Sequence, residues 1–127
     1  MEKTILVDGM HCIYDNDFEV NKKLLKILNL FDNRKILVVN GFIKKGLQVL
    51  EGENFDGFSL EEEGIKKTNQ FYFERLLEKF NLFADQVIYF DHNEDNVKSA
   101  QSLGILSIQY DGSNEKIRNF IEENIEY

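Results

Sequence analysis

Five short apolar runs, each separated from the next by a segment with helical periodicity, constrain the fold of this chain more than any other feature. The expected strands are 3–8, 35–40, 55–60, 86–91 and 106–111, and the expected helices are 21–31, 43–50, 69–80, 94–104 and 113–125. Strands that are apolar on both faces are typical of a parallel sheet covered on both sides. Right-handed crossovers then predict an α/β, three-layer, doubly wound (Rossmann-like) fold, with a five-stranded parallel sheet and helices on both faces.

The length and composition of the chain limit its organisation and its partners. With 127 residues it is long enough to bury one core, so we expect a single domain spanning 1–127. A net charge of −8 argues against broad binding to nucleic acid or to anionic membranes. We expect neither a membrane-spanning segment nor a signal peptide. The single cysteine, Cys12, forbids an internal disulfide, so we expect a cytoplasmic protein in which Cys12 is a small packed side chain.

Three polar residues stand at the ends of expected strands. Asp8 ends the first strand, Asn40 the second, and Asp91 the strand over 86–91. The carboxyl ends of parallel strands meet at one edge of the sheet, where ligands bind in doubly wound folds. The sequence therefore predicts that these three side chains converge on one open cleft.

The most specific segment runs from Lys66 to Ile105. Its second part reads D-x-x-x-x-N-V-x-x-A-x-x-x-G-I from Asp91 to Ile105. With Asp8 at the end of the first strand, this pattern resembles the haloacid dehalogenase-like (HAD) superfamily, which consists mostly of phosphatases and phosphotransferases. The resemblance runs nearly end to end, and it implies a HAD-like fold.

The resemblance assigns roles to individual residues. Asp8 matches the nucleophile that forms an aspartyl-phosphate. Asn40 is similar to the residue that donates to a phosphate oxygen. Lys67, with Lys66 as the runner-up, looks like the catalytic lysine that neutralises the nucleophile and the phosphate. The implied metal is Mg²⁺, bound by Asp8, the backbone carbonyl of Met10 and Asp91.

Two residues depart from the pattern of the superfamily. Met10 stands where a second aspartate usually acts as general acid and base, a role typically worth roughly 10²- to 10⁴-fold in rate. His92 replaces an acidic residue in the fourth motif, and imidazole is a poorer ligand for Mg²⁺ than oxygen. We therefore expect weak Mg²⁺ binding and weak phosphatase turnover. A metal pair formed by His11 and His92 with the two aspartates is a less favoured hypothesis.

The spacing of the motifs leaves no room for an inserted cap domain. Only a loop and one helix fit between Asp8 and Asn40, and only a helix and a strand between Asn40 and Lys67. The leading interpretation is a capless HAD-like hydrolase of the phosphatase class with a degenerate site. The alternative is a non-catalytic pseudoenzyme that binds a phosphorylated small molecule or a protein partner, and oligomerisation is compatible with both. Some relatives without the second aspartate act on carbon–halogen or carbon–phosphorus bonds, but they generally carry a cap.

Overall fold

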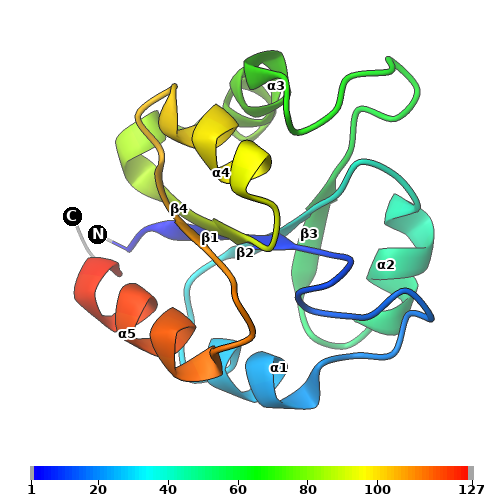
Figure 1. The fold of residues 1–127 in the computed structure, drawn as a ribbon, viewed down its shortest axis with the longest axis vertical. Coiled ribbons are helices and arrows are strands. Elements are labelled where there is room, and N and C mark those ends of the chain that lie inside the picture. The colour runs from blue at the N-terminus through cyan, green and yellow to red at the C-terminus, as the bar shows by residue number, and fades with distance from the viewer. Residues whose placement is uncertain (1, 126–127) are drawn as a thin grey trace.

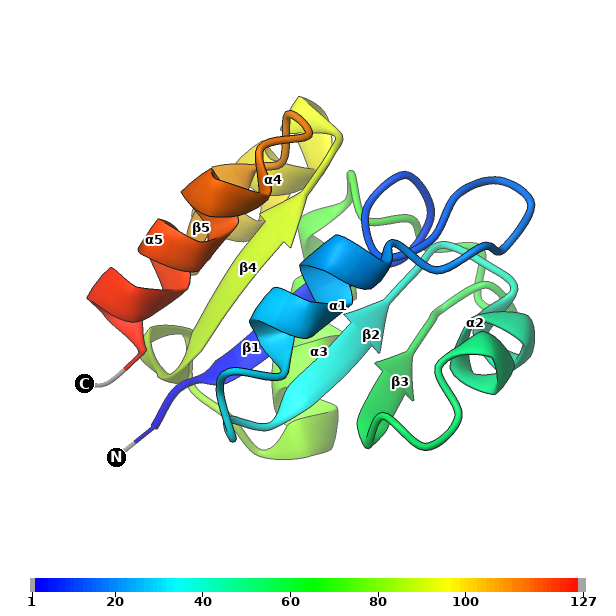
Figure 2. The same ribbon diagram turned by 90° about the horizontal axis from the view of Figure 1, so that it is seen from below.

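The computed structural model describes residues 2–125 and contains one parallel sheet in the order β3-β2-β1-β4-β5 (Figures 1 and 2). Its strands are β1 (Thr4–Asp8), β2 (Lys35–Val38), β3 (Phe55–Phe58), β4 (Val87–Asp91) and β5 (Leu106–Gln109). Every predicted strand is present inside its predicted range. The strand order reverses at β1, so the switch point of the fold lies beside the carboxyl ends of the central strands β1, β2 and β4.

Helices cover both faces of the sheet, which confirms the predicted three-layer architecture (Figure 1). The helices are α1 (Lys22–Leu28), α2 (Ile43–Val49), α3 (Gln70–Phe80), α4 (Glu94–Gln101) and α5 (Asn114–Asn124), and a short 3₁₀ turn, Ala84–Gln86, precedes β4. Helices α1, α2 and α5 pack on one face, and α3 and α4 pack on the other. Successive side chains of a strand point to opposite faces of the sheet, so each strand contributes to both halves of the core. In β1, Ile5 and Val7 face the first group of helices, and Leu6 faces the second.

The two edge strands differ from the prediction that strands are apolar on both faces. Strands β1, β2 and β4 are buried along their whole length, as predicted for parallel strands under two helical layers. In β3 only Phe58 is fully buried, and in β5 only Ser107 is. Each edge strand has a neighbour on one side only, and its helical cover is incomplete. Asp8 and Asp91, which were predicted to meet at one edge of the sheet, end the central strands β1 and β4.

The loop over 9–20 connects β1 to α1 and folds back against the sheet edge. Tyr14, at the centre of the loop, is buried and pairs by short bridges with Met10 and Val20. The Tyr14 ring lies so close to Gly9 that a Cβ at that position would be 2.5 Å from its hydroxyl oxygen. A side chain at position 9 would therefore displace the loop from the end of β1, where Asp8 lies.

The connections between Asp8 and Lys67 contain only loops, α1, α2, β2 and β3. These are the elements that lie between the two residues in the described part of the chain. No helix within residues 2–125 is both long enough and apolar enough to cross a membrane.

Candidate active site

A buried lysine joins the ends of two neighbouring strands. The Lys67 Nζ lies 2.5 Å from Asp8 Oδ1 and 2.9 Å from Asp91 Oδ2. Asp8 ends β1 and Asp91 ends β4, and these strands pair in parallel with Val7 opposite Phe90. The three charged residues are between 0% and 3% exposed. The carboxyl edge of the sheet therefore holds a compact group of buried charges, which folded proteins retain only when the charges are paired.

The segment before α3 brings Lys67 to this position. Its backbone N–H donates to Asn40 Oδ1 at 2.8 Å, so the loop after β2 holds the lysine segment directly. The neighbouring Lys66 is exposed, and Lys67 is the lysine that reaches the aspartates. Because the oxygen of Asn40 accepts this bond, its amide group remains as a donor in the cleft that Asn40 lines. The structure thus brings Asp8, Asn40, Lys67 and Asp91 together.

Asp91 is held by more partners than the sequence suggested. Its Oδ2 accepts from the Tyr89 hydroxyl and from Asn96 Nδ2 at 3.2 Å, in addition to Lys67. Its Oδ1 accepts from the backbone N–H of Asn93 at 2.8 Å. Sequence analysis missed Tyr89, although two residues that are two positions apart on a strand share one face. These bonds hold Asp91 rigidly as a support at the end of β4.

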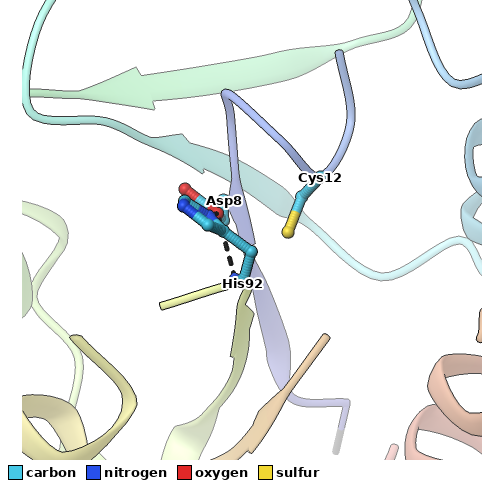
Figure 3. A group of neighbouring side chains, drawn as sticks. All are labelled: Asp8, Cys12 and His92. Carbon is cyan, nitrogen blue, oxygen red and sulfur yellow. Dashed lines mark hydrogen bonds and ion pairs between the residues drawn. The ribbon is translucent and has the colours of Figure 1, made fainter. Parts of the chain in front are cut away.

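His92 lies beside Asp8 (Figure 3), and its ring nitrogen also approaches Asp91. Its Nδ1 is 2.6 Å from Asp8 Oδ2 and 3.3 Å from Asp91 Oδ1, and its backbone N–H also donates to Asp8 Oδ2 at 3.3 Å. The side chain is 35% exposed, so one side of the ring remains open to solvent. Both oxygens of Asp8 therefore have a partner, Lys67 on one and His92 on the other.

The pKa values of the group follow from burial and from these pairs. Burial alone would raise the pKa of Asp8, but Lys67 and His92 hold that pKa well below its usual value. Burial and the charge of Asp8 raise the pKa of Asp91. Burial would lower the pKa of Lys67, but the two carboxylates raise it above the usual value. The hydrogen bond to Asp8 raises the pKa of His92. Asp8 is therefore ionised at neutral pH.

The residues around Asp8 fit Mg²⁺ poorly. Mg²⁺ requires oxygen ligands in nearly octahedral geometry, and the facing oxygens of Asp8 and Asp91 are of the right kind. However, the space between these two oxygens is occupied by the imidazole of His92, whose Nδ1 approaches both. Asp8 and Asp91 could serve as Mg²⁺ ligands together only after this ring has moved. The structure thus adds a steric reason to expect weak binding.

A cleft of about 460 Å³ opens above Asp8 at the carboxyl edge of the sheet. Asp91 lies beneath this cleft and does not line it, unlike the arrangement that we expected. Phe42 and Glu61 do line the cleft, and Glu61 Oε2 accepts from the backbone N–H of Phe42 at 3.2 Å. Glu61 is exposed and forms part of the wall of the cleft. The lining residues are Asp8, Met10, His11, Tyr14, Val39, Asn40, Gly41, Phe42, Glu61, Lys67, Thr68, His92, Asn93 and Asn96.

Cys12 lies beside the charged group. It is buried, as expected for a small packed side chain, and it belongs to the core under α1 and α5. Burial, and then the charge of Asp8, raise the pKa of the Cys12 thiol, so the thiol is protonated and is a poor nucleophile at neutral pH. Sequence analysis did not reveal that Cys12 is close to His92.

The chain is similar in structure to several solved proteins. An uncharacterized protein from Corynebacterium glutamicum matches with a TM-score of 0.73 and 13% identity, over 100% of this chain and 98% of that one. The core domain of a candidate phosphoglycolate phosphatase from Streptococcus pneumoniae matches with a TM-score of 0.66 and 17% identity, over 96% of each chain. A HAD-family enzyme from Bacteroides thetaiotaomicron, in complex with magnesium and inorganic phosphate, matches with a TM-score of 0.65 and 14% identity, over 89% and 96%.

Likeness in sequence is much weaker than likeness in structure. No protein-family model matches the chain, and no curated protein matches it by sequence. The three structural matches described above nevertheless cover 89–100% of the chain, and they include a HAD-family enzyme and the core of a phosphatase candidate. Together with the parallel five-stranded sheet and its strand order, they establish that this chain has the haloacid dehalogenase-like fold.

Proposed function

We propose that the protein is a HAD-like hydrolase of the phosphatase class with a degenerate active site and weak turnover. The observation that carries the proposal is the state of Asp8, an ionised carboxylate at the base of an open cleft and paired with Lys67. A buried carboxylate with a strongly shifted pKa in a cleft is typical of a functional group. In this proposal Asp8 attacks the phosphorus atom of a small phosphorylated substrate, the bond between phosphorus and the leaving oxygen breaks, and the phosphoryl group remains on Asp8 as an aspartyl-phosphate while the rest of the substrate leaves as an alkoxide or aryloxide.

The neighbouring residues would bind the phosphoryl group. The Lys67 ammonium would bind one phosphate oxygen while it stays close to Asp8, and the Asn40 amide would donate to another. Asp8, the Met10 carbonyl and Asp91 remain the proposed ligands of weakly bound Mg²⁺. When bound, Mg²⁺ would reduce the electrostatic repulsion between the nucleophile and the phosphate. His92 stands in the way of that ion, which is the reason for proposing weak binding.

Met10 limits the reaction after the first step. Its side chain can neither protonate the leaving oxygen nor activate the water that would hydrolyse an aspartyl-phosphate. A substrate with a good leaving group does not need the first of these roles. With such a substrate we expect phosphoryl transfer to Asp8 to be faster than hydrolysis. A mass gain of one phosphoryl group on the wild-type protein would then be seen, and Asp8→Asn would not show it.

The alternative is a pseudoenzyme that binds a phosphorylated ligand or a protein partner without catalysis. One observation favours it: both carboxylate oxygens of Asp8 are already engaged, by Lys67 and by His92. An attack on phosphorus would require Asp8 to lose one of these partners. The two functions make different predictions for variants that restore the missing groups.

The decisive experiment compares the wild type, Met10→Asp, His92→Asp and the double variant on an alkyl phosphate with Mg²⁺, because an alkoxide is a poor leaving group and needs the proton donor. Met10→Asp restores the proton donor, and His92→Asp replaces the blocking ring with an oxygen ligand. Since acid catalysis needs a charge-neutralised phosphate, the double variant should gain more than the product of the two single gains. The rate of phosphate release is the readout.

The matched control is Asp8→Asn placed in the double variant, which keeps both restored groups and removes the nucleophile. Circular dichroism must show that each variant is folded, because a new aspartate at position 10 could be poorly solvated. If the folded double variant releases phosphate no faster than its Asp8→Asn control, the hydrolase proposal is wrong and the binding role is preferred.

A further inference from the structure

We propose that Asp8, Cys12 and His92 form a binding site for a divalent cation of the zinc class. One ligand atom from each residue, a carboxylate oxygen, the thiol sulfur and an imidazole nitrogen, lies within 4.8 Å of the other two. Figure 3 shows the Cys12 sulfur pointing toward the paired Asp8 and His92 side chains. This inference goes beyond the hydrolase proposal and does not depend on catalysis.

The three ligands come from two parts of the fold that meet at one place. Asp8 ends β1 and Cys12 lies on the turn that follows it, where its backbone N–H donates to the Gly9 carbonyl at 3.1 Å. His92 directly follows β4, the strand beside β1. The turn is also tied to α1, because Asn21 Nδ2 donates to the Cys12 carbonyl at 3.2 Å. The backbone therefore holds the three residues close together before any ion is present.

The kind and number of the ligands fit zinc. Zinc binds thiolate, imidazole and carboxylate at about 2.0–2.3 Å, and sites with three protein ligands keep a fourth position for water. Here Asp8 and Cys12 are buried while His92 is partly open, so the fourth position would face the cleft. Tetrahedral coordination places ligand atoms about 3.4 Å apart, so shifts of about 1 Å would complete the site.

The charges of the site support a divalent cation. Asp8 can ligate through Oδ2, because its ion pair with Lys67 uses Oδ1. His92 then gives up its hydrogen bond to Asp8 and binds the ion through Nδ1 with the neutral ring. Cys12 binds as a thiolate, and its proton passes to the solvent buffer. The two anionic ligands, Asp8 and Cys12, balance the charge of the ion.

The same residues discriminate against Mg²⁺. Thiolate and imidazole prefer zinc-class ions, whereas Mg²⁺ prefers carboxylates, carbonyls and water. His92, whose Nδ1 lies near an oxygen of Asp8 and an oxygen of Asp91, would become a ligand for the softer ion. We therefore expect His92→Asp to weaken zinc binding and to strengthen Mg²⁺ binding, a reversal that a nonspecific surface site would not show.

The test is a titration of the metal-free protein, kept reduced without competing thiols, with Zn²⁺ by calorimetry and with Co²⁺ by absorption. We expect one ion per chain. We also expect the near-ultraviolet charge-transfer band that reports a cobalt–thiolate bond. Loss of a direct ligand should exceed the about 10- to 100-fold effect of losing an outer partner, so Cys12→Ser should weaken Zn²⁺ binding by about 100-fold or more. The cobalt–thiolate band should disappear in that variant.

The matched control is His11→Gln, since His11 stacks edge to face on His92 with ring centroids 5.0 Å apart but is not one of the three ligands. It should retain both the zinc affinity and the cobalt band. The proposal is overturned if Cys12→Ser binds Zn²⁺ as tightly as the wild type, or if the wild type shows no cobalt–thiolate band. His92→Asp covers the case in which Cys12→Ser does not fold, because His92 is partly exposed. Unchanged zinc affinity in that variant would also overturn the proposal.

Discussion

Two lysines are almost excluded from solvent, but their surroundings differ. Lys67 lies at the carboxyl edge of the sheet and is 3% exposed, and Lys35 lies at the amino edge and is 7% exposed. Lys67 pairs with two carboxylates. Lys35 begins β2, and its Nζ donates to the backbone carbonyls of Phe31 at 2.5 Å and Asn33 at 2.9 Å. Among the described residues, no carboxylate lies within ion-pair distance of Lys35.

The pKa values of the two lysines shift in opposite directions. Burial lowers the pKa of Lys35, and the more distant charges of Asp32 and Glu2 oppose the shift only in part. Burial also acts on Lys67, but Asp8 and Asp91 raise its pKa above the usual value. A lysine that binds carbonyls closes a turn of the chain. A lysine between two buried carboxylates holds charges together at a cost in desolvation, which points to a functional site rather than to a source of stability.

The largest expected difference between the two edges is in the free energy of unfolding that is lost when each lysine is replaced by methionine. Lys67→Met would leave Asp8 and Asp91 buried without their shared cation, and breaking a buried pair in this way costs about 3–5 kcal/mol. Lys35→Met leaves two carbonyls without a donor but also removes a buried charge, so a loss of about 1 kcal/mol is expected. Urea unfolding of both variants and the wild type, read from the transition midpoints at constant slope, measures the difference. Equal losses of unfolding free energy in the two variants would contradict the proposed difference between a lysine paired with carboxylates and a lysine bound to carbonyls.

A smaller effect should appear when the partner of Lys67 is also changed. In an Asp8→Asn background one of the two carboxylates is already neutral, so Lys67→Met should cost about 1–3 kcal/mol less than it does in the wild type. The four proteins of this cycle, unfolded under one set of conditions, give the coupling energy. If the losses of the two single variants add up to the loss of the double variant within about 0.5 kcal/mol, Asp8 and Lys67 do not interact in solution.

The contrast between the two edges also explains what could be predicted from the sequence. The strands were predicted because each central strand is a continuous buried run, a pattern that depends only on neighbours along the chain. The convergence of Asp8 and Asp91 followed from parallel topology, since neighbouring parallel strands end at the same edge. Lys67 lies on an irregular segment before α3, where no periodicity places a side chain, so only the resemblance to a family pointed to it.

The finer geometry of the site could not be predicted in this way. The contact of His92 with Asp8 depends on the register that sets Val7 opposite Phe90, and on the direction that the ring takes after β4 ends. The position of Cys12 depends on the tight turn after Gly9. At the amino edge, the contacts of Lys35 with two carbonyls depend on the conformation of the turn between α1 and β2. Each of these features is a three-dimensional consequence of the chain's path and has no local signature in the sequence.

The smallest effect is a dependence of stability on pH that separates the two lysines. The folded pKa of Lys35 lies below its value of about 10.4 in the unfolded chain, so the folded protein loses this proton first as the pH rises. The unfolded state then binds more protons, and the contribution of Lys35 to stability rises with pH up to about 10.4. The folded pKa of Lys67 is raised, so its contribution is fully present below about 10.4 and is lost only above it.

Tyrosines with raised pKa values also titrate in alkali, and they include Tyr14, Tyr72 and Tyr89, so the wild type alone cannot isolate Lys35. The free energy of unfolding of the wild type minus that of Lys35→Met removes every group that the two proteins share. This difference should increase between about pH 8 and pH 10, because only the wild type gains stability as Lys35 releases its proton. Urea unfolding in steps of pH provides the measurement. If this difference in the free energy of unfolding stays level or falls over this pH range, Lys35 is stabilised in its charged form, as Lys67 is. Backbone carbonyls would then stabilise a buried ammonium group as well as two carboxylates do.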